Sequence, residues 1–260
     1  MGTNGPQRIV CLTAETTEIA FALGRGDRVV GVSGYAVRPP EARKKPKVAA
    51  FSTAHVQRIL ALEPDLVLGF SDLQADIARD LIRAGVNVLI TNQRTIEQTY
   101  DAMLMIAGVL RAEAQGAAIV SAMRGELEAI ERASHALRQR PRVYFEEWDA
   151  PMISGIAWVG EIIELCGGAD IFPELRAGSS AAQRFVTGAD VIERDPEVII
   201  ASWCGKKARL ERIAARPGWE AISAVRRGRV HEVKAPDILQ PGPSLVHGAR
   251  QIAKILGAAG

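Results

Sequence analysis

The strongest constraint on the fold is a regular alternation of short apolar runs, rich in β-branched residues, with longer amphipathic segments. Before residue 95 the runs read RIVCL, RVVGVS, DLVLGF and VNVLIT, and helix-length segments with apolar residues at i, i+3 and i+4 separate them. After residue 140 the pattern resumes with RVYFEEW, EVIIASW and RVHEV. Buried strands separated by amphipathic helices are typical of an α/β fold, because neighbouring parallel strands need a helical crossover. The sequence therefore predicts two α/β regions with mainly parallel sheets.

The stretch 95–139 interrupts this alternation, because it has no strand-like run and few helix breakers. Its apolar residues recur at near-helical spacing: Leu110, Val120, Met123, Leu127 and Ile130. This spacing predicts at least one long helix. We therefore expect an N-terminal α/β lobe over residues 1–110, a connecting helix over 111–140 and a C-terminal α/β lobe over 141–260.

A weak internal repeat supports two related lobes. ILALEPDLVLGF (Ile59–Phe70) resembles VIERDPEVIIASW (Val191–Trp203), and in both an acidic-Pro-acidic turn leads into a buried strand that finishes on an aromatic residue. Ligands of open parallel sheets bind beyond the carboxyl ends of the strands. We therefore expect these aromatic strand ends to face each other across a ligand cleft.

Composition excludes several classes of partner. The net charge is +2 and the basic residues are scattered, which argues against nucleic acid and against an anionic membrane surface. No apolar run approaches the roughly 18 to 20 residues of a transmembrane helix, and the N-terminus has no secretory signal pattern. The expected location is the cytoplasm if the chain is complete, or the periplasm if a leader was removed. Three cysteines without paired spacing do not suggest a disulfide framework.

The adjacent acids Glu146 and Glu147 at the end of one predicted strand raise the question of catalysis. Neighbouring side chains in a strand point to opposite faces, so these carboxylates diverge and do not form a two-acid catalytic pair. Solvated strand-end acids and a polar contact to a ligand both stay open. The four histidines lack metal-ligand spacing, so no metal site is predicted, although Cys204 could ligate a metal that a ligand already holds.

Aromatic residues at predicted loop ends are the strongest binding signal. Each aromatic residue alone is more often core than ligand contact, but rings at the strand ends of both lobes suit a broad, flat, largely apolar ligand. Gln240 in ILQPGPS adds an amide. The aromatic candidates are Tyr35, Phe51, Phe70, Trp148, Trp158 and Trp203.

The segment RIVCLTAETTEIAFALGRGDRVVGVSGYAVRPPEA resembles the start of cobalamin-binding proteins of ABC importers, within a wider family that carries cobalamin, haem and iron–siderophore complexes. VQRILALEPDLVLGF, ISGIAWVGEIIELCGGADIF and IERDPEVII extend the resemblance over nearly the whole chain. It implies a class III periplasmic-binding-protein-like fold, in which two Rossmann-like lobes are joined by a single long α-helix. It also implies vitamin transport without catalysis or a catalytic cofactor. Tyr35 and Phe51 match positions of aromatic residues against the corrin ring, and Phe70 matches a further cleft aromatic.

The sequence also departs from the transporter-linked members of that family. Those members present one Glu on each lobe to arginines of the permease, whereas this chain has Asp76 near the first position and Ala189 followed by Asp190 near the second. Docking on an ABC permease is therefore only weakly matched. Cys166 matches a disulfide-bonded cysteine of a periplasmic relative, but Ala253 stands at its partner position, so that bond should be absent. FEEWDAP, ASWCGKK and LQPGP resemble a subgroup of homologues without a signal peptide.

Three functional hypotheses follow. The first is a non-catalytic, monomeric binding protein for a cobalamin-like corrinoid. The second is a binder of an iron–siderophore or of haem for an ABC importer, with Arg38 and Arg94 as anion contacts. The third is a cytoplasmic enzyme or chaperone that uses Cys204 as nucleophile or thiolate ligand, with Glu147 or His231 as guesses for a base. The predicted ligand-binding residues are Tyr35, Arg38, Phe51, Phe70, Glu146, Glu147, Trp148, Trp158, Trp203, Cys204 and Gln240.

Overall fold

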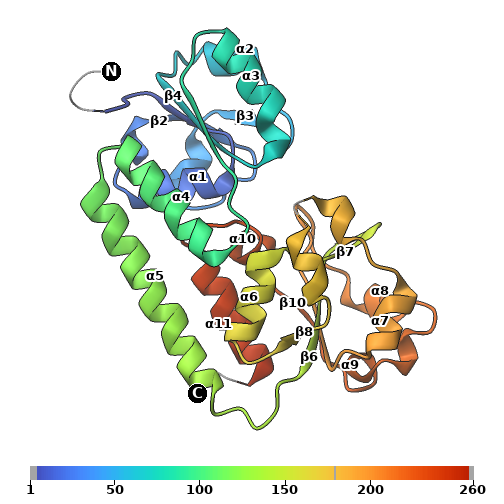
Figure 1. The fold of residues 1–260 in the computed structure, drawn as a ribbon. Helices are drawn as coiled ribbons and strands as arrows, with labels where there is room; N and C mark the ends of the chain where they lie inside the picture. Colours follow the sequence, from blue (N-terminus) through green and yellow to red (C-terminus); the bar gives the residue numbers. More distant parts are fainter. Residues whose placement is uncertain (1–4, 179, 258–260) are drawn as a thin grey trace. The chain divides into compact units, whose positions relative to one another are not determined.

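A computed structural model describes residues 5–178 and 180–257 of the chain (Figure 1). The chain divides into two compact units. Unit 1 contains the chain up to Met123 together with Pro241–Pro243, and unit 2 contains Arg124–Gln240 and the chain from Ser244 onward. The border lies inside one helix, α5 (Glu113–Ser134). The predicted borders at residues 110 and 140 lie on either side of this helix, and that division into three parts stays a prediction.

Unit 1 is built on a five-stranded sheet in the order β3-β2-β1-β4-β5. All of its strand pairings are parallel, and Ile9 of β1 pairs with Val29 on one side and Leu66 on the other. Four of the strands coincide with the predicted runs, whereas β3 was not predicted because it is a three-residue strand at the end of a basic, Pro-rich segment. The strands are β1 (Ile9–Cys11), β2 (Val29–Ser33), β3 (Lys47–Ala49), β4 (Leu66–Phe70) and β5 (Val88–Thr91).

Helices cover both faces of the unit 1 sheet, α2 and α3 on one side and α1 and α4 on the other (Figure 1). The strands β1 and β4 are therefore buried along their whole length, which explains why they read as continuous apolar runs. The helices are α1 (Ala14–Ala22), α2 (Val56–Leu60), α3 (Ala75–Arg83) and α4 (Ile96–Val109), with 3-10 turns η1 (Gly26–Arg28), η2 (Pro40–Lys44) and η3 (Asp72–Gln74).

The predicted long helical stretch is confirmed as two consecutive helices, α4 and α5. The side chain of Thr95 caps α4 by accepting a hydrogen bond from the Gln98 backbone N–H at 3.1 Å. Leu110 ends α4, and Arg111 adopts a positive φ of 54° before α5 begins. A single residue in the left-handed region breaks the helix here without glycine or proline, so the break has no strong sequence signal.

Unit 2 has a sheet in the order β10-β9-β6-β7, and β8 also pairs with β6. The pairings of β6 with β8 and β9 and of β9 with β10 are parallel, whereas β6 and β7 form an antiparallel hairpin. The three runs predicted after residue 140 form β6, β9 and β10. The short strands β7 and β8 were not predicted. The strands are β6 (Arg142–Asp149), β7 (Met152–Ser154), β8 (Ala169–Asp170), β9 (Val198–Ala201) and β10 (Val230–Glu232).

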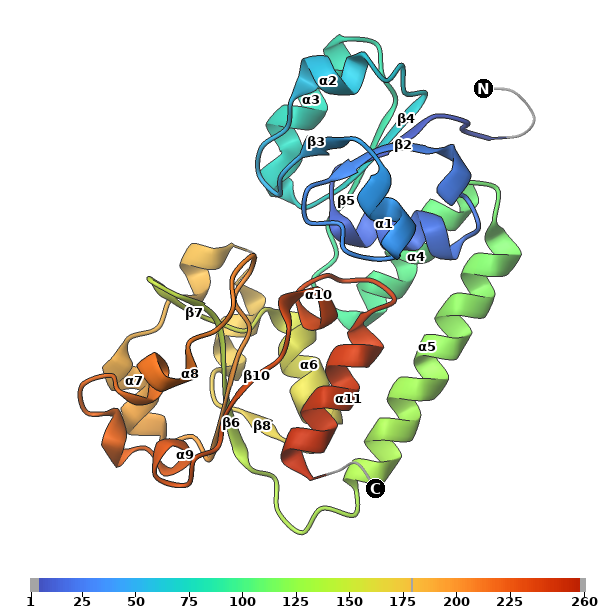
Figure 2. The same cartoon turned by 180° about the vertical axis from the view of Figure 1, so that it is seen from behind.

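One face of the unit 2 sheet packs against α6 and α11, and the other against α7, α8 and α9 (Figures 1 and 2). The helices are α6 (Ala157–Leu165), α7 (Gly188–Arg194), α8 (Leu210–Ala214), α9 (Ser223–Arg226), α10 (Ala235–Ile238) and α11 (Leu245–Leu256). The 3-10 turns are η4 (Pro173–Ala177), η5 (Ala181–Arg184) and η6 (Trp219–Ala221).

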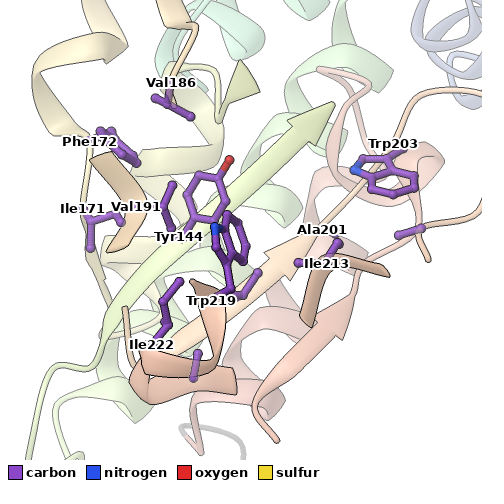
Figure 3. Close-up of a cluster of buried hydrophobic side chains, with 13 residues drawn as sticks. Tyr144, Ile171, Phe172, Val186, Val191, Ala201, Trp203, Ile213, Trp219 and Ile222 are labelled. Carbon is purple, nitrogen blue, oxygen red and sulfur yellow. The ribbon is translucent and has the colours of Figure 1, made fainter. Parts of the chain in front are cut away.

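An aromatic cluster fills the second of these interfaces (Figure 3). The Tyr144 ring of β6 meets Trp219 edge-on at a centroid distance of 6.1 Å and Phe172 at 5.9 Å. Edge-to-face packing at such distances is favourable for aromatic quadrupoles. This cluster holds β6 at Tyr144, two residues before the first of the predicted acids.

Candidate functional site

The strand order of unit 1 places its candidate site at the carboxyl ends of β1 and β4. The chain runs from β1 to β2 and β3 on one side and then crosses to β4 and β5 on the other. Ligands of open α/β sheets bind at such a reversal of strand order, where the two neighbouring connections diverge. Thr13, two residues after β1, and Ser71, directly after β4, are buried.

Two phenylalanines meet at this edge. The rings of Phe51 and Phe70 lie 6.3 Å apart and are tilted by 49°. Gln74 holds both residues, because its Oε1 accepts from the Phe70 backbone N–H at 3.1 Å and its Nε2 donates to the Phe51 carbonyl at 2.9 Å. Phe70 is buried and Phe51 half-buried. Phe51 is therefore the member of the pair with surface available to a ligand.

Further cationic and aromatic groups lie in the loops that follow the strands of unit 1. The Arg94 guanidinium lies 5.4 Å from the Phe70 ring centroid and donates to Asp72 at 2.8 Å. Tyr35, in the loop after β2, is 44% exposed, so its ring is accessible to a ligand. Half-buried Arg38 lies 3.6 Å from Glu18. The edge thus combines ring faces with guanidinium groups.

Glu15 was not predicted as a site residue, yet it is the most perturbed carboxyl group of unit 1. It lies in the first turn of α1, directly after β1, and is 3% exposed. Within the described residues its Oε1 has no hydrogen-bond partner. Burial raises the pKa of Glu15 from 4.5 to about 7. An acid in the first turn of a helix is ordinarily solvated, so the sequence pattern gave no sign of this burial.

In unit 2, Glu146 is completely buried and surrounded by donors. Arg216 binds both of its oxygens, with an Nη2 to Oε1 distance of 2.9 Å, and Trp203 Nε1 donates at 3.1 Å. The Tyr144 hydroxyl donates to Oε2 at 3.3 Å. Burial raises the pKa of Tyr144 well above 10, and the Glu146 carboxylate adds to this rise. In this conformation Glu146 has no exposed surface for the predicted ligand contact.

Glu147 faces the opposite side of β6, as the alternation along the strand predicts. Buried Arg184 binds it through two hydrogen bonds, of 2.6 and 3.0 Å, and also donates to the Ser154 carbonyl at 2.5 Å. The two neighbouring acids therefore form separate ion pairs on opposite faces. Because each carboxylate has its own guanidinium partner, the arrangement is not that of a two-acid catalytic site.

Two tryptophans, an acid and a lysine converge where β6 and β9 end. The Lys206 ammonium lies 4.0 Å from the Trp148 ring centroid and 4.8 Å from that of Trp203. The same ammonium donates to Asp149 at 2.6 Å. Trp148 is half-buried and Trp203 buried, whereas the neighbouring Cys204 is exposed. The sequence predicted Trp148, Trp203 and Cys204 as site residues but not Asp149 or Lys206.

Trp158 lies in the interior of unit 2. It belongs to α6, is 2% exposed, and its indole N–H donates to the Ile238 carbonyl at 2.9 Å. A direct contact of Trp158 with a ligand, as predicted from its place in the sequence, would therefore need a different conformation.

Gln240 is half-buried and directly precedes the Pro241–Pro243 segment of unit 1. Gln93 donates to the Pro241 carbonyl at 3.5 Å within that unit.

The two acids considered for permease docking differ in their surroundings. Asp76 in the first turn of α3 is highly exposed and pairs with Arg79 at 2.6 Å. Asp190 forms a reciprocal cap at the start of α7, where its carboxylate accepts from the Thr187 backbone N–H and hydroxyl, each at 2.7 Å. The Thr187 hydroxyl bonds lower the pKa of Asp190. Asp190 is thus committed to a helix cap, whereas Asp76 projects from the surface.

Replacing Thr187 by alanine is expected to lower the free energy of unfolding of unit 2 by about 1 kcal/mol, because the Asp190 backbone N–H loses the hydroxyl that accepts its hydrogen bond at 3.2 Å. Urea unfolding followed by tryptophan fluorescence measures this loss. Ser180→Ala, which removes the analogous cap of the short η5 turn, is the comparison. An unchanged stability of the Thr187 variant would contradict the assigned cap.

The thiols and acids of the described residues do not gather into a metal site: no three His, Cys, Asp or Glu side chains meet there in a suitable group. Cys11 and Cys166 are free and buried, and burial raises the pKa of each to about 12. Both are therefore protonated at neutral pH and poor nucleophiles. The Cys166 thiol contacts the Ala249 carbonyl at 3.3 Å. Burial lowers the pKa of His231 on β10.

Two α/β units with mainly parallel sheets, connected by a long helix, define the class of bilobal solute-binding proteins. The family model described as "Periplasmic binding protein" matches residues 9–236. The chain belongs to this family, which confirms the resemblance seen in the sequence. The predicted fold class, class III periplasmic-binding-protein-like, is also confirmed, since solved structures of periplasmic binding proteins cover nearly the whole chain.

Relatives and solved structures agree with this assignment. An ABC transporter substrate-binding lipoprotein of Bacillus subtilis (strain 168) is 28% identical over 96% of this chain and 79% of its own length. A vitamin B12-binding protein of Vibrio cholerae is 27% identical over 96% of this chain and 89% of its own length.

The crystal structure of the periplasmic vitamin B12-binding protein of V. cholerae has a TM-score of 0.79 at 25% identity and covers 97% of each chain. A periplasmic haem-binding protein from Roseiflexus sp. RS-1, in apo form, has a TM-score of 0.85 at 24% identity, covering 98% of this chain and 100% of its own. Among the described residues, no helix has both the length and the apolar character needed to cross a membrane.

Proposed function

We propose that this chain is the non-catalytic substrate-binding protein of an ABC importer and that its ligand is a cobalamin-like corrinoid. The observation that carries the ligand class is the group of aromatic side chains at the carboxyl edge of unit 1, with Tyr35 exposed and Phe51 half-buried against Phe70. The relatives named as vitamin B12-binding proteins, which match 96% and 80% of this chain, support the same class.

The chemistry of this edge suits a macrocycle with polar substituents. Ring faces of Tyr35 and Phe51 would contact the flat apolar surface of a corrin, and apolar burial contributes about 25 cal/mol per Å². The guanidinium groups of Arg38 and Arg94 would donate to amide carbonyls around the ring. Gln74 holds the Phe51 backbone and Asp72 holds the Arg94 side chain before any ligand binds, which lowers the ordering cost of binding and favours affinity in the submicromolar range.

Haem is the second candidate, and the same two arginines favour it. Haem carries two propionates, and guanidinium groups bind carboxylates through two parallel hydrogen bonds. Solved structures named as periplasmic haem-binding proteins share this fold. A ferric siderophore would also use the arginines but would need less aromatic surface. The enzyme or chaperone hypothesis has less support, because it rests on the exposed thiol of Cys204 alone.

The proposed partner is a membrane permease, and the proposed location is the outer side of the cytoplasmic membrane. A relative named as an ABC transporter substrate-binding lipoprotein supports both. Asp76 is the better docking candidate of the two acids, because its side chain is exposed whereas Asp190 caps a helix.

Calorimetric and visible-absorbance titrations with cyanocobalamin, haemin and ferrichrome test the ligand class. We expect a submicromolar dissociation constant for cyanocobalamin, weakened at least tenfold in Phe51→Ala and in Tyr35→Ala because each loses a ring contact. Phe185→Ala, which removes an exposed ring of unit 2, should bind as the unchanged protein does. Preferential binding of haemin would replace the corrinoid with haem. Absence of binding by both macrocycles at tens of micromolar would show that the tetrapyrrole proposal is wrong.

A further inference from the structure

The Lys206 ammonium occupies a small cage at the end of the unit 2 sheet. Trp148 and Trp203 lie against it at 4.0 and 4.8 Å from their ring centroids, and the Asp149 carboxylate contacts it at 2.6 Å. A cation within about 6 Å of a ring centroid is attracted by the negative face of the ring. Two indole faces and one carboxylate together form the kind of environment that binds organic cations.

Hydrogen bonds of the indole N–H groups hold both walls of the cage. Trp148 Nε1 donates to the Ala150 carbonyl at 3.1 Å, and Trp203 Nε1 donates to Glu146 at 3.1 Å. Glu146 is in turn fixed by Arg216. Because the polar edges of both rings are bound to unit 2, their faces remain in place when the lysine leaves. The cage is therefore preorganised by residues outside it.

The position of the cage in the fold is that of a ligand site. β6 lies between β7 and β9, and the chain reaches β9 only after passing through the hairpin strand β7 on the other side of β6. The carboxyl ends of β6 and β9 therefore form the reversal of strand order in unit 2, where open α/β sheets bind ligands. Asp149 closes β6, and Trp203 and Lys206 follow β9.

The Lys206 side chain can be displaced from the cage by a ligand. This side chain is 41% exposed and Lys206 lies in the turn that follows β9, so the side chain can move into solvent without opening the core. A tethered group competes with a free ligand at an effective concentration of about the millimolar range. The lysine therefore keeps the cage from binding weak competitors.

We propose that Trp148, Trp203 and Asp149 form a subsite for a small organic cation, such as a quaternary or methylated ammonium group, and that Lys206 occupies this subsite until such a ligand displaces it. A quaternary ammonium group spreads its charge over methyl surfaces that contact ring faces and loses little hydration on binding. The solute-binding family of the chain favours a free solute over a modified protein side chain. The subsite is independent of the corrinoid proposal, because all of its groups belong to unit 2.

Removing the competing lysine tests the subsite directly in the full-length chain. Calorimetry and saturation-transfer NMR with choline and with tetramethylammonium should give at least tenfold tighter binding in Lys206→Ala than in the unchanged protein. Lys206→Gln, which retains more of the side-chain length, serves as a second uncharged variant. Lys207→Ala, at the exposed next position, is the matched control for the loss of one positive charge and should bind as the unchanged protein does.

The neutral isostere 3,3-dimethyl-1-butanol separates cation binding from simple apolar contact. Choline should bind Lys206→Ala at least ten times more tightly than this alcohol does, and Trp148→Leu in the same background should remove the difference. Equal binding of choline and the alcohol, or failure of both lysine variants to bind either ammonium ion, would overturn the subsite. These titrations contain no corrinoid, so their outcome is separate from that of the cyanocobalamin titration.

Discussion

Replacing Arg216 by alanine is expected to lower the free energy of unfolding of unit 2 by about 3–5 kcal/mol. Glu146 is completely buried, and Arg216 is its cationic partner. Removing the guanidinium leaves a carboxylate in the interior whose remaining donors, Trp203 and Tyr144, carry no positive charge. The variant also loses the packing of the guanidinium over the Trp219 ring, 4.6 Å from its centroid. Since that desolvated charge cannot return to water, this is the largest single-residue effect we expect.

Tryptophan fluorescence can measure the stability loss of Arg216→Ala in unit 2 alone. The chain has four tryptophans, Trp148, Trp158, Trp203 and Trp219, and all of them belong to unit 2. Urea unfolding followed by tryptophan fluorescence therefore reports on that unit, even if the two units unfold separately. Arg212→Ala, at an exposed position of α8 four residues before Arg216, is the matched control. Its midpoint should stay near that of the unchanged protein.

A second replacement distinguishes charge burial from loss of packing. In Glu146→Gln/Arg216→Ala the buried group is neutral but still accepts hydrogen bonds, so the double variant should be more stable than Arg216→Ala alone. Removing a partner from a buried ion pair is costly mainly because of the charge that remains. The stability losses of Glu146→Gln and Arg216→Ala are measured separately. If the loss of the double variant equals the sum of these two losses, the pair is not coupled and the assigned role of Arg216 is wrong.

The sequence predicted most of the fold because several of its strands are fully buried. β1, β4 and β9 are continuous apolar runs, and such runs carry their own signal. β3, β7 and β8 are three residues or fewer, and unlike the equally short β1 and β10 they do not lie in runs with two β-branched residues. The hairpin partner β7 also follows the acids of β6 so closely that RVYFEEWDAPMISG reads as a strand followed by a loop.

Less of the candidate site could be predicted, because its contacts join distant parts of the chain. Glu146 and Glu147 were recognised as unusual, but their partners Arg216 and Arg184 lie 70 and 37 residues further on. Nothing in the local pattern distinguishes these arginines from solvated ones. Lys206 lies 57 residues from Asp149. The aromatic positions were visible because strand ends can be predicted, whereas which ring faces outward depends on tertiary packing, as buried Trp158 shows.

Replacing Glu15 by glutamine is expected to stabilise unit 1 at alkaline pH and to leave it nearly unchanged in acid. Burial raises the folded-state pKa of Glu15 from 4.5 to about 7, and the nearby Glu18 carboxylate adds to the rise. Below the lower value both the folded and the unfolded state are protonated, so folding carries no penalty. Between the two values only the unfolded state ionises, and the folded state loses about 1.4 kcal/mol per pH unit. Above the higher value the penalty stays constant at about 3 kcal/mol.

Glutamine has nearly the same shape but no ionisable group, so Glu15→Gln should exceed the unchanged protein in stability by about 3 kcal/mol at about pH 8 and by almost nothing near pH 4.5. Hydrogen exchange of the β1 and α1 peptides, read by mass spectrometry, measures this difference in unit 1, which contains no tryptophan. Glu41→Gln, at an exposed position of η2, is the control and should show no such pH dependence. A gain from Glu15→Gln that is the same at both pH values would mean that the buried carboxyl does not titrate as described.

A confirmed gain would mean that the native acid opposes folding at the edge where β1 ends, and perturbed acids of this kind gather at functional sites. Comparing cyanocobalamin binding by the two proteins would then show whether the carboxyl group at this edge serves the ligand.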